Sequence, residues 1–158
     1  MMLEFYRNHF SDERKEIFRY LVIGHNAGFC HPSEYNRYDS LAVGSSLEKA
    51  LLKRSAFTPR TQRIVQAAGV MHELGHSLGI GPWNVGGNDN LSFAGGRAAK
   101  QEFLDEWGDY KSVMNYFWFA MRVFDYSDGS HGPNDVDDWA ALDVGSSREL
   151  LKNMILKV

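Results

Sequence analysis

The stretch HELGHSLG, residues 72–79, decides how this chain is organised. It closes a segment that predicts one long helix, because Pro59 suits a first helical position and Thr58 can cap it. Apolar side chains follow with the 3.6-residue period of a buried helix: Ile64, Ala67, Ala68, Met71, Leu74 and Leu78. Gly79 is the expected left-handed terminator, and Pro82 prevents continuation. We therefore expect one helix between Pro59 and Gly79.

Two histidines, His72 and His76, stand four residues apart in this helix. Residues at that spacing lie one above the other on a helix face, so both imidazoles can hold one metal ion. Zinc suits two neutral imidazoles with an open position, where it acidifies a bound water and polarises a carbonyl. Glu73 lies on the adjoining face and is the predicted general base, which takes the water's proton and passes it to the leaving amine.

The remaining segments predict shorter elements. We expect strands over 18–23 and 40–43, a loop over 26–39, a helix over 98–107, and a helix capped by Asn134 with acidic residues in its first turn. The 158 residues suit one domain spanning 1–158. The expected fold class is α/β (α+β): a small twisted mixed sheet packed on the long helix, then a mostly irregular C-terminal half with a terminal helix.

Composition excludes several classes of protein. The net charge is −3 and no segment gathers basic residues, so we expect no nucleic-acid partner. The longest apolar run is much too short to span a membrane. Cys30 is the only cysteine, so an intrachain disulfide is excluded. The first residues lack the pattern of a signal peptide, and the compartment and the oligomeric state stay open.

A second motif follows the helix. Gly79 extends the helix motif to His-Glu-x-x-His-x-x-Gly, and Ser112-Val113-Met114-Asn115-Tyr116 comes downstream. With both motifs in this order, the sequence resembles the metzincin clan of zinc endopeptidases over about residues 58–120. We call residues 112–116 the methionine turn.

The resemblance implies a role for each matching residue. His72 and His76 match the first two zinc ligands, and Glu73 matches the general base. Met114 matches the methionine that forms an apolar floor under the histidines. Tyr116 matches a tyrosine that approaches the metal in some branches and stabilises the oxyanion. The resemblance implies that the substrate is a peptide or protein. Residues 40–43 would be the edge strand of the sheet that pairs with it.

The third ligand departs from the clan's pattern. The position three residues after the glycine is Pro82, which has no donor atom. Asp89 is our first choice, because it lies in a Gly- and Asn-rich loop and carboxylate oxygen is an accepted zinc ligand. His131 follows the methionine turn, which is against the clan's order. Glu102 or Glu106 would complete a different arrangement, and a site completed by water also remains.

The predicted function is hydrolysis of peptide bonds by a zinc-dependent endopeptidase with one catalytic ion. The alternative is a catalytically silent zinc-binding interaction module that lost its third ligand; Pro82 supports it and the retained Glu73 speaks against it. A globular domain without metal is the third hypothesis. Only 71 residues precede His72, which is short for the clan, so we expect either a minimal sheet or a truncated domain.

Overall fold

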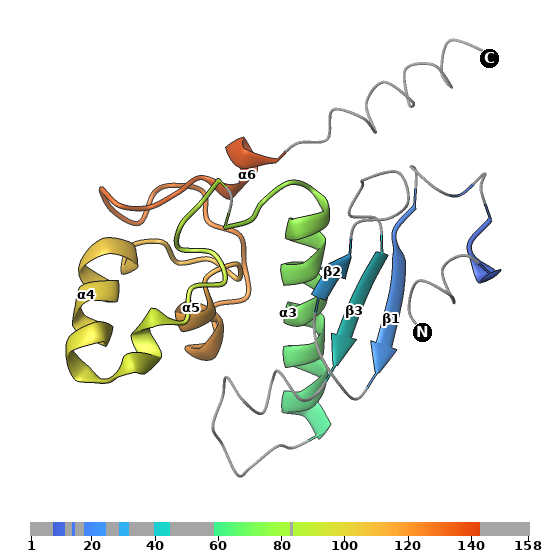
Figure 1. Ribbon diagram of the computed structural model, residues 1–158, viewed down its shortest axis with the longest axis horizontal. Helices are drawn as coiled ribbons and strands as arrows, with labels where there is room; N and C mark the ends of the chain where they lie inside the picture. Colours follow the sequence, from blue (N-terminus) through green and yellow to red (C-terminus); the bar gives the residue numbers. More distant parts are fainter. Residues whose placement is uncertain are drawn as a thin grey trace.

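The computed structural model describes residues 8–11, 14, 18–24, 29–31, 40–44, 59–82 and 84–142. Three short strands come first: β1 (Tyr20–Gly24), β2 (Phe29–His31) and β3 (Ser40–Gly44). The long helix α3 (Pro59–Ser77) follows. The remaining elements are η2 (Ser92–Gly95), α4 (Arg97–Trp107), α5 (Tyr116–Ala120) and α6 (Asp138–Ala141) (Figure 1). Helices α3 and α4 therefore match the predicted helices within a residue or two.

The three strands lie beside α3, in the order β1-β3-β2 (Figure 1). β1 runs parallel to β3, and β2 runs antiparallel to it. β3 is thus paired on both sides, so the expectation that residues 40–43 form an edge strand free to bind a peptide is wrong. β2 falls within the segment 26–39, for which a loop was expected.

The expected α/β class, with a twisted sheet as the framework of the domain, is also wrong, because the described chain is mainly helical. From Pro59 to Leu142 the described residues form helices and loops, with one isolated bridge between Asp128 and Asp137 and no strand. This is the part of the chain that carries both motifs. In this part of the chain the backbone groups are bonded within helices or to side chains, rather than between strands. The chain beyond Leu142, where a last packed turn or helix is also expected over 150–156, lies outside the described residues.

Helix α3 buries two histidines in line with an alanine, rather than the expected apolar stripe alone. Ala68, His72 and His76 are spaced by four residues and are all buried, whereas Ile64, a member of the predicted stripe, is 44% exposed. The reason is that α3 lies between the strands and the segments that carry α4 and α5, so it is covered on more than one face (Figure 1). The face with the histidines is turned toward the second half of the chain.

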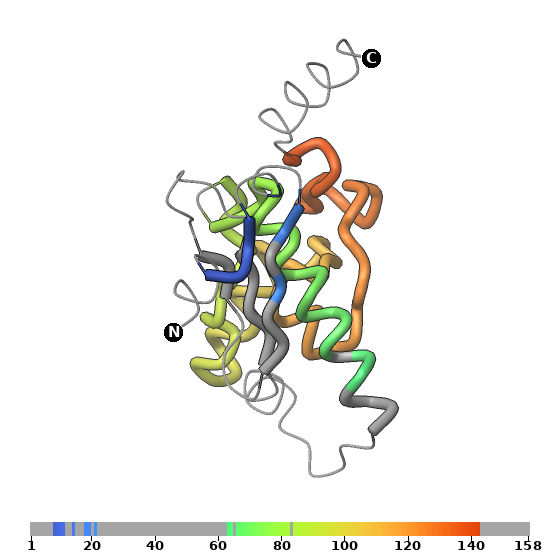
Figure 2. Tube along the Cα trace, turned by 90° about the vertical axis from the view of Figure 1, so that its right-hand side faces the viewer, coloured from blue at the N-terminus to red at the C-terminus, as the bar shows by residue number. Residues whose placement is uncertain are grey.

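The core of the described residues packs between α3 and the methionine turn. Its buried members are Ala68, Ile80, Val85, Tyr110, Val113, Met114 and Phe119. Figure 2 shows the orange segment after α5 running alongside α3, where the Tyr126 hydroxyl donates a hydrogen bond to the carbonyl of Met71. No helix in the described part of the chain combines the length and apolar character needed to cross a bilayer.

Candidate metal centre

The end of α3 positions the second histidine. Gly79 has φ of 100°, a left-handed conformation that glycine adopts without strain. The backbone N–H of Gly79 then donates to the carbonyl of His76, and that of Ile80 donates to the carbonyl of Gly75, which is the Schellman pattern. This turn brings the Ile80 carbonyl back over the helix end, 2.8 Å from Nδ1 of His76.

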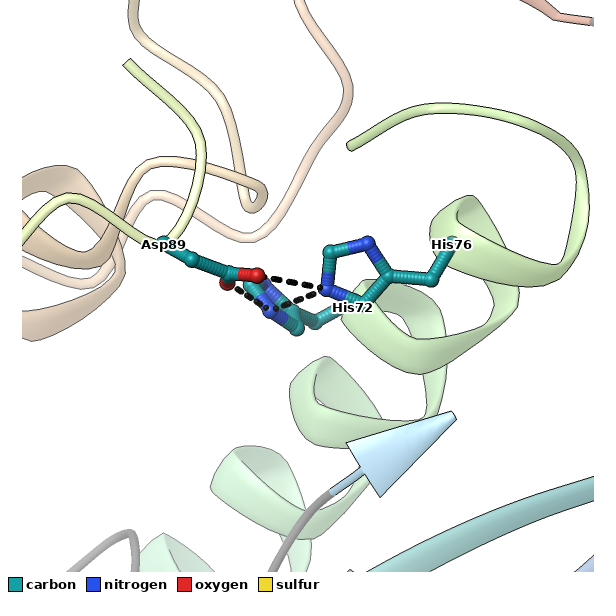
Figure 3. A group of neighbouring side chains, drawn as sticks. All are labelled: His72, His76 and Asp89. Carbon is teal, nitrogen blue, oxygen red and sulfur yellow. Dashed lines mark hydrogen bonds and ion pairs between the residues drawn. The ribbon is translucent and has the colours of Figure 1, made fainter. Parts of the chain in front are cut away.

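Three side chains converge beside α3, as Figure 3 shows. Nε2 of His72 lies 3.1 Å from Nε2 of His76 and 2.9 Å from Oδ1 of Asp89. Nε2 of His76 lies 3.2 Å from Oδ2 of Asp89. The structure therefore brings together two histidines that are four residues apart and an aspartate from the loop that follows the helix, in a group that can hold a metal ion.

Hydrogen bonds at the far side of both rings fix which nitrogen faces the group. Nδ1 of His72 contacts the carbonyl of Val113 at 2.9 Å, and Nδ1 of His76 contacts that of Ile80. A carbonyl only accepts, so each neutral ring carries its proton on Nδ1 and presents a bare Nε2. Two nitrogen lone pairs and a carboxylate then face one another at about 3 Å, and this arrangement needs a cation between them.

Without metal, a proton partly serves as that cation. Burial opposes the charged form of His76, but the hydrogen bond and the charge of Asp89 outweigh burial and raise the pKa of the imidazole. Burial likewise opposes ionisation of Asp89, but hydrogen bonds with His72 and His76 outweigh it and hold the pKa of the carboxyl well below its usual range. The carboxylate therefore stays charged and available as a ligand.

The donor set fits zinc. Tetrahedral zinc with bonds of about 2.0–2.1 Å places its ligand atoms about 3.3 Å apart. The separations here are 2.9, 3.1 and 3.2 Å, so a small outward shift of the side chains accommodates the ion. Both histidines are buried, and each has its outer nitrogen bonded to a backbone carbonyl, the arrangement that orients histidine ligands in metal proteins. Three protein donors leave a fourth position open.

Asp89 reaches the centre through an ordered loop. The Asn84 side chain ties the start of this loop to the helix end, since it accepts from the Gly81 N–H and donates to the Gly79 carbonyl, both at 2.9 Å. Asp89 itself has φ of 52°, a left-handed conformation that is uncommon outside glycine. Such a conformation persists where the surroundings impose it, and it is typical of functional sites.

Glu73 lies next to this group with one oxygen unused. The side chain is 2% exposed, and Oε2 has no hydrogen-bond partner among the described residues. Burial raises the pKa of Glu73, and the nearby His72 and His76 offset part of that rise. A buried carboxylate oxygen without a partner is costly to keep, so its presence beside three converging donors indicates a role toward a molecule bound there.

The methionine turn packs against the helix at Gly75, between the two histidines in the sequence. Met114 is buried, and a Cβ added at Gly75 would lie 2.4 Å from its Sδ. A larger residue at this position would therefore have to displace the Met114 side chain. Met114 is thus buried against the helix segment that carries both histidines, and its role as an apolar floor under a metal stays a prediction.

Tyr116 lies against the first histidine. Its ring stacks on that of His72, with centroids 5.0 Å apart and planes inclined by 13°. Burial and the charge of Asp89 raise the pKa of the phenol, and Asp89 also contributes through a hydrogen bond with it. The hydroxyl is therefore protonated at neutral pH and able to donate a hydrogen bond next to the metal group.

The other candidates for the third ligand lie elsewhere. Glu102 and Glu106 are exposed on α4. His131 pairs with Asp135, with 2.7 Å between Nδ1 and Oδ2, in a separate group on the loop before α6. None of these three residues belongs to the group around His72, whose third member among the described residues is Asp89.

Sequence reasoning missed the groups that hold the two histidines in place. The carbonyls of Val113 and Ile80 orient the two histidines, and no side-chain pattern reveals a carbonyl. Asp138 is one of the acidic residues expected in the first turn of the last helix, whereas its side chain is buried and accepts a hydrogen bond from Ser112 of the methionine turn. The sequence signal that could have indicated this burial is a carboxylate at a core position of a helix.

Comparisons of this chain with protein-family models, curated proteins and solved structures found no significant match.

Proposed function

We propose that this protein is a zinc-dependent endopeptidase. The observation that carries the proposal is the buried Glu73, whose Oε2 has no partner among the described residues, next to His72, His76 and Asp89. A metal site that only stabilises a fold takes four protein ligands and has no use for an additional carboxylate. Three donors with an adjacent unpaired carboxylate are typical of hydrolytic sites.

The residues of the chain divide the proposed reaction among them. His72, His76 and Asp89 would hold zinc, which supplies a Lewis acid that acidifies a water molecule and polarises a carbonyl. Glu73 takes the proton of the water as its oxygen attacks the carbonyl carbon of the peptide. The same carboxyl then gives the proton to the amide nitrogen as the C–N bond breaks. The Tyr116 hydroxyl donates a hydrogen bond to the oxyanion.

The raised pKa of Glu73 supports this assignment. A general base works best when its pKa lies closer to the working pH, and burial moves the carboxyl in that direction. Access for a substrate is supported by Asp89, whose side chain is 29% exposed while both histidines are buried. The metal group thus has one open side.

A peptide library tests the proposal. The zinc-loaded protein should cut peptides, a chelator should stop the cleavage, and added zinc should restore it. Glu73→Ala should keep zinc at full stoichiometry and lose cleavage, while Glu106→Gln, on the exposed side of α4, should behave as the parent protein. Turnover that survives Glu73→Ala would defeat the assignment of the base.

The alternative proposal, a silent zinc-binding module, rested on the lack of a donor at Pro82. Asp89 supplies a third donor from seven positions further along the loop, which removes that support. Zinc bound at one ion per chain with no cut in any peptide would nevertheless favour the silent module over the endopeptidase.

A further inference from the structure

A buried carboxylate connects the second half of the chain to the methionine turn. Asp138, the first residue of α6, is fully buried. Its Oδ2 accepts hydrogen bonds from the Ser112 hydroxyl at 2.5 Å and from the Ser127 N–H at 2.9 Å. The Ser112 hydroxyl in turn accepts from the N–H of Met114. Asp138 thereby fixes the start of the methionine turn.

The other oxygen of Asp138 is connected through Tyr110 to the loop that carries Asp89. The Tyr110 hydroxyl lies 2.6 Å from Oδ1 of Asp138 and 2.7 Å from Oδ1 of Asn88. Both Oδ1 atoms accept and the hydroxyl has one proton, so the hydroxyl donates to one of them at a time while it stays within hydrogen-bond distance of both. Tyr110 therefore bridges α6 and the residue immediately before Asp89.

Asn88 depends on this bridge. Its side chain is 1% exposed, and Nδ2 has no hydrogen-bond partner among the described residues. The contact with Tyr110 is thus the hydrogen bond that the structure gives this buried amide. Losing it would leave both polar atoms of the amide unsatisfied, which is costly in a buried position.

The loop backbone also rests on the Tyr110 ring. A Cβ added at Gly87 would lie 2.9 Å from Cδ1 of Tyr110 and 2.8 Å from Cε3 of Trp107. The approach is so close that only glycine fits, and it sets the height of the loop above the two rings. Two residues later the N–H of Asp89 donates to the Met114 carbonyl at 3.4 Å. The loop is therefore held on both sides of the point where it delivers its carboxylate.

We propose that Tyr110 and Asp138 are positioning residues that hold Asp89 at the metal centre. The inference rests on the metal site of the proposed function, and it explains how a ligand from a long loop can replace a donor next to the helix. Tyr110 acts on the loop and Asp138 fixes Tyr110. Partners of this kind, one contact away from a ligand, typically change metal affinity by about 10–100-fold when removed.

Zinc affinity and the visible spectrum of the cobalt-substituted protein test this role in the full chain. Tyr110→Phe keeps the ring and deletes the bridge, so we expect zinc to bind about 10–100-fold more weakly in competition with a chromophoric chelator. The cobalt absorption bands should shift because the ligand geometry changes. Tyr126→Phe is the matched control: it also deletes one phenol hydroxyl, which donates to the Met71 carbonyl and does not contact the loop. Its affinity and spectrum should match the parent protein.

Each outcome bears on the inference. Parent-like zinc affinity and cobalt bands in Tyr110→Phe would overturn it. If that variant does not fold, Asn88→Ala takes its place, because it leaves the contact between Tyr110 and Asp138 intact and should weaken zinc binding in the same way. A parent protein that binds zinc without cutting peptides would overturn the proposed activity alone. A parent protein that binds no zinc would overturn both.

Discussion

Replacing Glu73 with glutamine should stabilise the metal-free protein while it removes the proposed activity. The side chain is 2% exposed, and its Oε2 has no partner in the described part of the chain. Burial raises the pKa of the carboxyl, which shows that the fold works against the ionised form. Glutamine has nearly the same shape and no charge, so it removes the free-energy cost of keeping an ion out of water.

The expected size follows from the unpaired oxygen. Leaving a buried polar group unsatisfied costs about 1–3 kcal/mol, and more when the group is charged. The glutamine NH2 lacks the same partner, so only part of this cost is recovered, and we expect the free energy of unfolding to rise by about 1 kcal/mol at neutral pH. Loss of the general base should lower peptide cleavage by about 10²–10⁴-fold. Urea unfolding of chelator-treated protein and cleavage by the zinc-loaded protein measure the two effects.

The pH dependence identifies the charge as the cause. An acid whose pKa is raised in the folded state destabilises the fold most above that pKa, and the cost shrinks as the pH falls toward the pKa of the unfolded chain. The advantage of Glu73→Gln should therefore be largest near about pH 8 and shrink toward about pH 5. Glu106→Gln, which is exposed, should stay within about 0.5 kcal/mol of the parent at every pH. A glutamine variant that is less stable than the parent at neutral pH would refute the reasoning.

Three further predictions concern the ligands and their support. Asp89→Asn keeps a residue that tolerates the left-handed backbone but removes the charge, so isothermal titration should show much weaker zinc binding with an unchanged far-UV spectrum. Gly75→Ala should displace the Met114 thioether by about 1 Å. Overpacking costs about 1–3 kcal/mol and the better helix propensity of alanine returns about 1 kcal/mol, so urea unfolding should show a net loss of stability of up to about 2 kcal/mol. An unchanged cobalt spectrum would contradict the close packing of Met114 on the helix. The raised pKa of His76 stabilises the metal-free fold below the pKa of the unfolded histidine, and this contribution is lost as the pH rises through the folded pKa, so metal-free protein should unfold at lower urea near about pH 8 than near about pH 6. Zinc should abolish that difference and release a proton on binding, which a pH-indicator titration detects.

The helix and the two histidines of the candidate metal group could be predicted from local pattern. Pro59 at the start, Gly79 at the end and histidines four residues apart fix a helix and one of its faces by backbone geometry alone. Asp89 could be ranked first from its position in a Gly- and Asn-rich loop, but its place beside Nε2 of His72 is a tertiary fact. The fold class could not be predicted in the same way: the two predicted strands form, but residues 59–142 form helices and loops whose packing depends on contacts between distant segments.

The sequence by itself determined a helix that presents two imidazoles and a neighbouring carboxylate, because the period of a helix follows from backbone hydrogen bonding and needs no distant partner. Which carboxylate joins the two histidines depends on tertiary contacts. Residues far apart in the chain had to meet for that: Asp138 with Tyr110 beneath the loop, and the methionine turn with Gly75. Such contacts depend on how whole segments pack together, and no local pattern in the chain records them.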